Sequence, residues 1–344
     1  MCCKIKVAAL TGGKYDPSAR FRVRQLIPAL LQEGIEMDEF IPPISKYPPS
    51  QQWFRPLWGI ATLAGRIPAV IATYRYDIVL LQRELLSTLV TLEPFTKRPR
   101  VLDVDDAIFL HRDGRFAKQL AQLSDLIICG NDFIAEWFSK WNNNIAIIPT
   151  AVDTRRYIPR EENRSSQGKL VIGWIGTSGN FKYLYKIESA LERVIKKRSE
   201  IIFKIISDQK PKFKEKLNEK IEYVKWSPKT EIADIQSMTI GIMPLDNTEW
   251  EKGKCSFKML QYMACGIPVI VSPVGINAQI LSESKVGFGV ISLKDWVDTL
   301  IFLLNSPEQR KKMGSNGRKL VEAKYSINAI VPKLSSYFKA ITRQ

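Results

Sequence analysis

Residues 253–277 read GKCSFKMLQYMACGIPVIVSPVGIN, and this stretch carries most of the information on the fold. Ser256 is a residue type that caps helices, and good helix formers follow it as far as Cys265. Gly266 and Pro268 end that helix, and Val-Ile-Val comes next, as in a buried strand. The stretch therefore predicts a helix that is followed directly by a buried strand.

Two polar side chains share a face of this predicted helix. Lys258 and Gln261 are three residues apart, and Lys258 lies in the first turn, where free backbone N–H groups and the helix dipole favour an anion. A phosphate beside Lys258 and a sugar hydroxyl beside Gln261 would suit this pattern. The spacing alone favours the alternative, an ordinary amphipathic helix with both side chains in solvent.

The run FKMLQYMACGIPVIVSPVG, residues 257–275, resembles the donor-site signature of glycosyltransferase family 4, also called group 1. The family pattern is E-x7-E followed by Ala-Met-Ala-x-Gly-x-Pro-Val-Val, and residues 261–269 fit its tail. Gly253 and Gln261 stand where the pattern has its two glutamates. The resemblance implies an α/β protein of the GT-B fold, with two Rossmann-like domains facing a cleft. It also implies transfer with retention of anomeric configuration and no obligatory metal.

Length and charge agree with a two-domain protein that has an anionic partner. The 344 residues exceed twice a typical domain, and the net charge is +16. Nucleic acid, an acidic membrane surface and phosphorylated substrates would each suit this charge. The basic residues are scattered, and the chain has neither zinc-finger spacing nor an RNA-recognition motif. We therefore expect a nucleotide-sugar and a membrane surface as partners, and no nucleic acid.

The expected domains follow from composition and from the resemblance. Residues 1–158 form an N-terminal Rossmann-like acceptor domain, and the polar run PREENRSSQGK at 159–169 is the linker. Residues 170–325 form the C-terminal nucleotide-sugar domain. Residues 326–344 form a helix that packs back on the N-terminal domain.

A glycine loop near the N-terminus is one candidate binding element. An apolar strand at 4–10 precedes Thr11-Gly12-Gly13, and a basic helix with Arg22 follows, which is the start of a Rossmann-like unit. Glycines let backbone approach a ligand closely. In the resembled family this loop helps to bind phosphate, so Gly12, Gly13 and Arg22 are candidates. A plain turn is the alternative.

Three carboxylates end a predicted strand that begins at Arg100. Asp103, Asp105 and Asp106 belong at the ligand-binding edge of a parallel sheet, where they would raise each other's pKa or hold a cation. A solvated loop is the alternative. The resembled family often has a sugar-binding histidine here, so Asp105 and Asp106 become the catalytic candidates. His111 is the one histidine, and we expect no metal site.

A second glycine loop, Gly-Thr-Ser-Gly-Asn at 176–180, follows a predicted strand at 170–175. Such a loop before a helix suits phosphate. The resemblance makes Thr177, Lys182 and Lys258 the donor-diphosphate residues, with Thr177 in place of the family's arginine. The glycine spacing also leaves open an NAD-dependent sugar-nucleotide epimerase or reductase.

The remaining donor contacts and the substrates come from the resemblance. Trp226, at the end of a predicted strand from 221, is a candidate wall for the nucleotide base, and Gln261 is a candidate ribose contact. The donor is a nucleotide-diphosphate sugar that acts as substrate, with no separate cofactor. The acceptor is a hydroxyl on a glycan, a lipid-linked molecule or a small molecule. Loss of both glutamates leaves a nucleotide-sugar-binding relative without catalysis as an alternative.

Residues 53–73 raise the question of a membrane. They are strongly apolar and begin with Trp53, but Arg66 and Pro68 interrupt the apolar run. The run is at or below the length that a helix needs to cross a bilayer. An interfacial helix and a buried helix both fit. Five cysteines without metal spacing and the lack of a signal-peptide pattern indicate the cytoplasm. We therefore expect a cytoplasmic protein, with contact to the inner face of a membrane.

Overall fold

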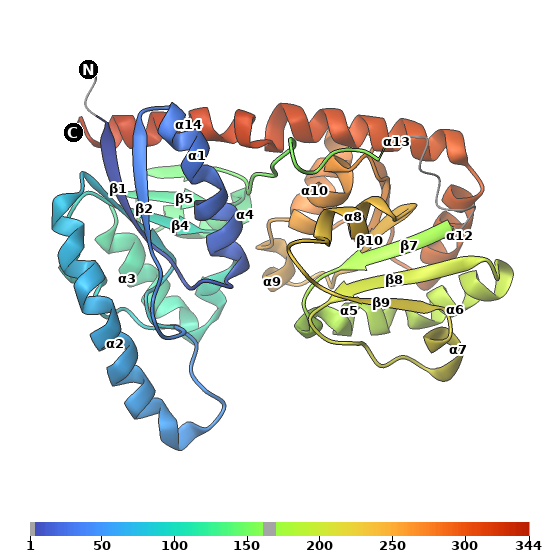
Figure 1. Ribbon diagram of the computed structural model, residues 1–344, viewed down its shortest axis with the longest axis horizontal. Helices are drawn as coiled ribbons and strands as arrows, with labels where there is room; N and C mark the ends of the chain where they lie inside the picture. The colour runs from blue at the N-terminus through green and yellow to red at the C-terminus, as the bar shows by residue number, and fades with distance from the viewer. Residues whose placement is uncertain (1–3, 161–169, 344) are drawn as a thin grey trace. The chain divides into compact units, whose positions relative to one another are not determined.

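The computed structural model describes residues 4–160 and 170–343, which form two compact units (Figure 1). Unit 1 comprises the described residues up to Ala151, together with Lys252–Cys255 and the segment from Ile327 onward. Unit 2 comprises the described parts of Val152–Glu251 and Ser256–Ser326. The predicted linker at 159–169 falls almost entirely outside the described residues.

Unit 1 is built on a six-stranded sheet in the order β2-β1-β3-β4-β5-β6, with parallel pairing throughout. Its strands are β1 (Ile5–Leu10), β2 (Ile35–Phe40), β3 (Ile78–Gln82), β4 (Arg100–Val104), β5 (Leu126–Cys129) and β6 (Ile145–Ile147). Its helices are α1 (Ile27–Gln32), α2 (Arg55–Ala72), α3 (Arg115–Leu123), α4 (Asp132–Ser139) and α14 (Ile327–Ile341). Apolar residues of α14 pack in one core with the sheet, among them Ile330 and Phe338.

Unit 2 has a second six-stranded parallel sheet, in the order β12-β11-β10-β7-β8-β9. Its strands are β7 (Leu170–Ile175), β8 (Ile201–Ser207), β9 (Ile221–Lys225), β10 (Ile240–Met243), β11 (Val269–Val271) and β12 (Gly287–Gly289). Its helices are α5 (Phe181–Lys186), α6 (Glu188–Lys197), α7 (Glu215–Asn218), α8 (Glu231–Gln236), α10 (Phe257–Ala264), α11 (Ile276–Glu283), α12 (Leu293–Leu304) and α13 (Pro307–Leu320), and α9 (Glu249–Lys252) spans the boundary between the units.

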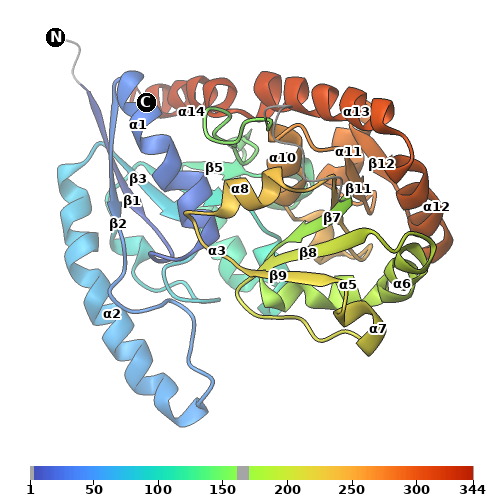
Figure 2. The ribbon, with the colours of Figure 1, turned by 45° about the vertical axis from the view of Figure 1, so that its right-hand side comes forward.

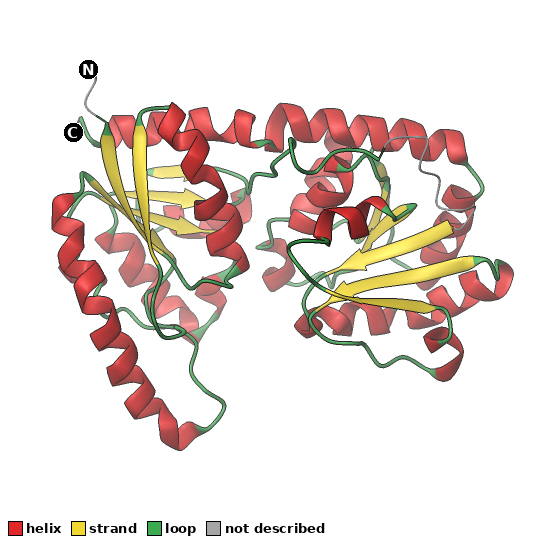
Figure 3. Ribbon diagram, viewed as in Figure 1, coloured by secondary structure: helices red, strands yellow, loops and turns green. Residues whose placement is uncertain are grey.

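Apolar side chains on both faces of each strand explain the layered build, with helices on both sides of each sheet (Figure 3). In β8, Phe203 and Ile205 face a core with α6 and α12, whereas Ile206 faces a core with α10. Strands buried on both faces read as continuous apolar runs, which is typical of parallel sheets. The predicted fold class, α/β with two Rossmann-like units, is confirmed.

The stretch at 253–277 forms helix α10 and strand β11, as predicted. Met259 and Met263 are buried, and Gly266 ends the helix with a φ of +69°, in the region that favours glycine. The predicted cap is wrong, because Ser256 has a φ of +53° and its side chain makes no capping hydrogen bond. A capping residue normally has an extended backbone, which Ser256 does not adopt.

Two elements of unit 1 differ from the prediction. The basic helix begins as a π-helical turn (Ala19–Val23) and a 3-10 turn (Arg24–Leu26), and only α1 is regular. Strand β2 was not predicted, because three acidic residues interrupt its apolar character. Ile35 and Met37 alternate toward the core, as expected for a strand at the sheet edge.

Candidate active site

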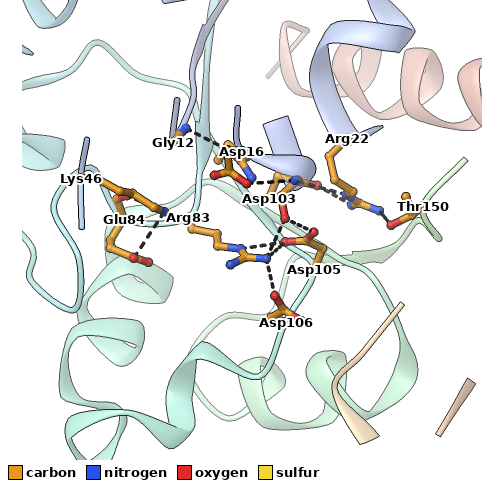
Figure 4. A network of polar contacts seen from close by, with 12 residues as sticks. Gly12, Asp16, Arg22, Lys46, Arg83, Glu84, Asp103, Asp105, Asp106 and Thr150 are labelled. Atoms are coloured by element: carbon orange, nitrogen blue, oxygen red, sulfur yellow. Dashed lines mark hydrogen bonds and ion pairs between the residues drawn. The ribbon is translucent and has the colours of Figure 1, made fainter. Parts of the chain in front are cut away.

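The two predicted catalytic carboxylates of unit 1 share one arginine, Arg83 (Figure 4). Arg83 donates from Nε to Asp105 Oδ1 at 2.7 Å and from Nη2 to Asp106 Oδ2 at 2.6 Å. The same Nη2 donates to Ser18 Oγ at 2.8 Å, and this hydroxyl donates to Asp105. Strands β3 and β4 are parallel neighbours, so the residues that follow them meet at one edge of the sheet.

Arg83 was not identified as a functional residue from the sequence, and in the structure it directly follows β3. It is buried and has a φ of +60°, a region in which residues other than glycine are uncommon. Such a conformation costs about 1 kcal/mol or more and persists where the surrounding structure holds it. Three hydrogen-bond partners, Ser18, Asp105 and Asp106, hold the Arg83 guanidinium in place.

The environments of the two carboxylates push their pKa values apart. Burial opposes ionisation of Asp105, but the charges of Arg83 and Arg22 and the Ser18 hydrogen bond outweigh it and lower the pKa. Burial and the Asp105 charge raise the pKa of Asp106, against the effect of Arg83. The Asp106 side chain is also 27% exposed, whereas Asp105 is buried. Asp105 is therefore a fixed anion, and Asp106 is the better placed group to exchange a proton.

Arg22 and Asp103 form a separate, structural ion pair. Arg22 Nε donates to Asp103 Oδ2 at 3.1 Å, and Nη1 donates to the Ile148 carbonyl oxygen at 2.6 Å. Both side chains are buried, and the Asp103 carboxylate keeps the pKa of Arg22 raised despite burial. These contacts occupy Arg22 inside unit 1, so they argue against a role for it in binding phosphate.

The three strand-end aspartates do not form the cation site that was one prediction from sequence. Asp103 pairs with Arg22, and Asp105 and Asp106 pair with Arg83. In the part of the chain that the structure describes, no group of three or more His, Cys, Asp or Glu side chains is arranged to hold a metal ion.

The first glycine loop lies beside this network, at the end of β1. Gly12 N–H donates to Gln82 Oε1 at 3.0 Å, which ties the loop to the end of β3. A Cβ on Gly12 would come within 2.1 Å of Asp16 Oδ2, so a larger residue would displace the Asp16 carboxylate. A Cβ on Gly13 would have nothing within 4 Å, but its φ of +158° is a backbone conformation that other residues rarely adopt. Both predicted glycines are therefore constrained, Gly12 by the Asp16 side chain and Gly13 by its backbone.

Buried polar atoms without a hydrogen-bond partner in the protein gather next to Gly12. They include Asp16 Oδ2, Gln82 Nε2 and Glu84 Oε2. Lys46 is fully buried with its Nζ 3.4 Å from Glu84 Oε1, and burial lowers its pKa. Unsatisfied donors and acceptors side by side suit water or a ligand with hydroxyl groups, since a hydroxyl both donates and accepts.

In unit 2, the second glycine loop follows β7, next to the end of β8. Thr177 is exposed, and its Oγ1 accepts a hydrogen bond from Asn180 Nδ2 at 2.9 Å. The backbone N–H and hydroxyl of Ser178 donate to Asp208 at 2.6 and 2.8 Å. Although burial opposes it, these bonds lower the pKa of Asp208. A carboxylate therefore already occupies one N–H group of the loop that we predicted to bind phosphate.

The two predicted donor lysines both follow this loop in the sequence, and the structure brings the distant Lys258 onto it. A Cβ on Gly176 would come within 2.7 Å of Lys258 Cε, and Lys258 Nζ lies 5.9 Å from the centre of the Trp174 ring. Lys182 is exposed on α5, with Nζ 4.8 Å from the ring centre of Tyr183. Trp226 follows β9 and is 38% exposed.

Gln261 lies on the buried side of α10. Its Nε2 donates to Tyr157 Oη at 3.0 Å and to Glu231 Oε1 at 2.8 Å. The amide nitrogen is thus bonded inside unit 2, and the solvent-exposed alternative is wrong for this residue. Gly253, at the other glutamate position, has no room for a side chain, because a Cβ would lie 2.5 Å from the Ala107 Cβ.

Comparison with known proteins identifies the second unit. Residues 169–306 match the model of a family described as glycosyl transferases group 1. These residues form a group 1 glycosyltransferase domain. The predicted resemblance is confirmed by this match, which covers the glycine loop after β7, Lys258 and Gln261.

The curated relative of the chain is distant in sequence. Spore coat protein SA of Bacillus subtilis (strain 168) is 23% identical over 250 residues, and the match covers 64% of each chain. The chain thus spans about two thirds, 64%, of the length of this curated relative.

Solved structures show the same fold over nearly the whole chain. Sucrose-phosphate synthase (tll1590) from Thermosynechococcus elongatus is 15% identical with a TM-score of 0.73, covering 99% of this chain and 100% of that one. Anabaena Alr3699/HepE in complex with UDP and glucose is 14% identical with a TM-score of 0.70, covering 98% and 100%. WaaG, a glycosyltransferase involved in lipopolysaccharide biosynthesis, is 12% identical with a TM-score of 0.67, covering 96% and 99%.

Proposed function

We propose that the protein transfers a sugar from a nucleotide-diphosphate donor to a hydroxyl acceptor in glycan or polysaccharide biosynthesis. The observation that carries this proposal is the group 1 glycosyltransferase domain at 169–306. The donor is itself a substrate, so the proposal includes no separate cofactor. UDP-sugars are the first donors to test, because the similar Anabaena HepE has been solved with UDP-glucose.

The donor side of the reaction belongs to unit 2. Lys258, which lies against Gly176, and Lys182 on α5 supply positive charge for the diphosphate that leaves. Fixed charges of this kind can lower a barrier by several kcal/mol, because they need no reorganisation during the reaction. Trp226 offers a half-exposed ring to the base, and Thr177 an exposed hydroxyl. We leave Gln261 out of the donor contacts, because its amide nitrogen is bonded to Tyr157 and Glu231.

The acceptor side belongs to unit 1, where Asp106 takes the catalytic role. As the acceptor oxygen bonds to the anomeric carbon, the bond to the donor phosphate breaks and the hydroxyl proton passes to Asp106. A base with a raised pKa suits this step, because its protonated form is then less unfavourable near neutral pH. Asp105 stays ionised and holds Arg83, which in turn bonds and positions Asp106. Retention of anomeric configuration remains part of the proposal.

A binding-only relative is the second candidate. It is favoured by the two glutamate positions, since Gly253 has no room for a side chain and Gln261 points inward. An NAD-dependent epimerase or reductase has less support, because its glycine loop lies within the glycosyltransferase domain.

The test is release of nucleoside diphosphate from a panel of UDP-, GDP- and ADP-sugars, with and without glycan and lipid-linked acceptors. Acceptor-dependent release that Asp106→Asn abolishes, while donor affinity stays unchanged, supports the transferase. Donor binding without release under any acceptor favours the binding-only relative. The proposed location is the cytoplasm, with the acceptor met at the inner face of a membrane.

A further inference from the structure

Helix α2 buries polar side chains and exposes apolar ones, which is the reverse of the usual arrangement for a helix in contact with water. Of its three buried residues, Thr62 and Arg66 are polar and only Val70 is apolar, and the polar Thr73 just after the helix is buried as well. Arg66 Nη2 donates to the Thr11 carbonyl oxygen at 2.8 Å, and burial lowers the pKa of Arg66 to about 10. A helix in contact with water normally turns its apolar stripe toward the core and its charges outward.

The outward side of α2 carries the large apolar residues. Trp53 is 80% exposed, Ile60 69% and Ile71 65%, and Leu57, Ile67 and Tyr74 are exposed as well. Together with Ala64 they recur at steps of four and three residues, so they form one continuous line, which we call the outer stripe. The part of the stripe on α2 lies along 18 residues, about 27 Å at 1.5 Å per residue, and Trp53 and Tyr74 lie in the 3-10 turns that flank the helix. Figures 1 and 2 show α2 at the edge of unit 1, away from α1 and α14.

The exposed charges within residues 40–76 have one sign. These residues contain no aspartate or glutamate, and of their four cations Lys46 and Arg66 are buried, which leaves Arg55 and Arg75 on the surface. Arg55 and Arg75 are exposed, one at each end of α2. Cations beside exposed aromatic and aliphatic side chains are the pattern of a helix that lies in the interface of an anionic membrane. A second copy of the chain would bring the same cations together, which disfavours pairing between two outer stripes.

Length and composition alone would let the helix from Gln52 to Arg75 cross a bilayer. Its inner side argues against crossing, because Arg66 donates to the Thr11 carbonyl oxygen and Thr73 Oγ1 accepts from the backbone N–H of Lys97, both elsewhere in unit 1. Inserting α2 would remove Arg66 from this buried site. A helix that stays packed on unit 1 can expose only its outer stripe to lipid.

We propose that the outer stripe of α2 docks on the surface of a bilayer rich in anionic phospholipid, with Arg55 and Arg75 at the headgroups. This inference deepens the proposed location by naming the surface and the lipid. It does not depend on glycosyl transfer, so vesicle binding and transferase activity are independent results of its test.

The test uses sedimentation of the full chain with vesicles of phosphatidylcholine, with or without phosphatidylglycerol. The intact protein should bind only the anionic vesicles, and added salt should weaken binding. A triple variant, Trp53→Ser, Ile60→Ser and Ile71→Ser, should bind at least about tenfold more weakly, because three apolar side chains no longer enter the interface. Ile291→Ser is the matched control, since Ile291 is 84% exposed in unit 2.

Several outcomes would overturn the proposal. One is vesicle binding by the triple variant equal to that of the intact protein, with both melting at the same temperature. Another is that the intact protein does not bind vesicles and is a dimer by light scattering, whereas the triple variant is a monomer. Activity on a soluble acceptor should be the same in both proteins, so a loss of vesicle binding cannot be mistaken for a failure of the transferase.

Discussion

Replacing Arg83 with methionine tests the arrangement of the two carboxylates most sharply. The change removes the cation that bonds Asp105 and Asp106 and leaves Asp105 buried. Breaking a buried ion pair from one side costs about 3–5 kcal/mol. Arg22 and Ser18 still favour the Asp105 anion, so we expect the lower end, about 3 kcal/mol at pH 7. For a protein of this size that lowers the melting temperature by about 6–12 °C.

The pH dependence of this loss follows from the direction of the pKa shift. The pKa of Asp105 in the folded protein is lowered, so its stabilisation is present above the unfolded value of about 4 and is lost as the pH falls. In Arg83→Met, the buried carboxyl has a raised pKa instead and becomes neutral in acid. The difference in stability between variant and intact protein should therefore begin to shrink above about pH 4, as the pH falls through the raised pKa of the variant, and should go on shrinking in acid.

Denaturant unfolding at a series of pH values measures this difference. Arg98→Met is the matched control, because the Arg98–Asp125 pair has its arginine 63% exposed and should contribute less than about 1 kcal/mol. A loss for Arg83→Met that equals the control, or that does not change with pH, would refute the arrangement. In the enzyme assay, the acid limb of kcat/KM should move to higher pH, since Asp106 also loses its cation.

Three further predictions concern the two sites. Asp106→Asn should lower kcat by about 100-fold or more with unchanged nucleotide affinity, measured by product release and calorimetry; an active variant would contradict the role of Asp106. Lys258→Ala should weaken UDP binding about tenfold by calorimetry, because a charged contact to the diphosphate is lost, whereas the control Lys186→Ala, whose cation pairs with Asp246, should not. Gln261→Glu should destabilise the protein by about 1–3 kcal/mol in denaturant unfolding without improving donor binding, since it places a second carboxylate beside the buried Glu231; tighter donor binding would show that Gln261 reaches the donor after all.

The sequence was sufficient to predict the fold, because its strands are buried on both faces. Runs such as residues 170–175 are apolar without interruption, and glycine loops follow them, so strand type and order were readable. The edge strand β2 was missed because it contains Glu36, Asp38 and Glu39, and Glu39 breaks the alternation of apolar and polar residues after only four positions. A strand with one neighbour needs fewer buried positions and gives a weaker pattern.

The candidate site was only partly predictable. Asp105 and Asp106 were identified from their place after a strand, but their partner Arg83 comes from another strand, 22 residues before Asp105. Sequence spacing does not show which charges meet across a sheet. The inward direction of Gln261 was hidden too, because every α10 residue from Met259 to Ala264 is buried. In such a short helix no polar face remains to mark the solvent side.

The apolar segment at 53–73 shows a similar limit. Its helical character was readable, but apolar residues occupy several sides of α2, so the pattern did not say which side meets the core. The alternative of a buried helix is wrong, because most of its large apolar residues are exposed. The buried positions of Thr62 and Arg66 in the structure show that polar residues of α2 face inward.

Acceptor-dependent release of nucleoside diphosphate, measured for the intact protein and for Asp106→Asn under the same conditions, tests the central claim most directly. We expect release by the intact protein with one donor base, and at least about 100-fold slower release by the variant at equal donor affinity. Equal rates in both proteins, or no binding of any nucleoside diphosphate by the intact protein, would contradict it.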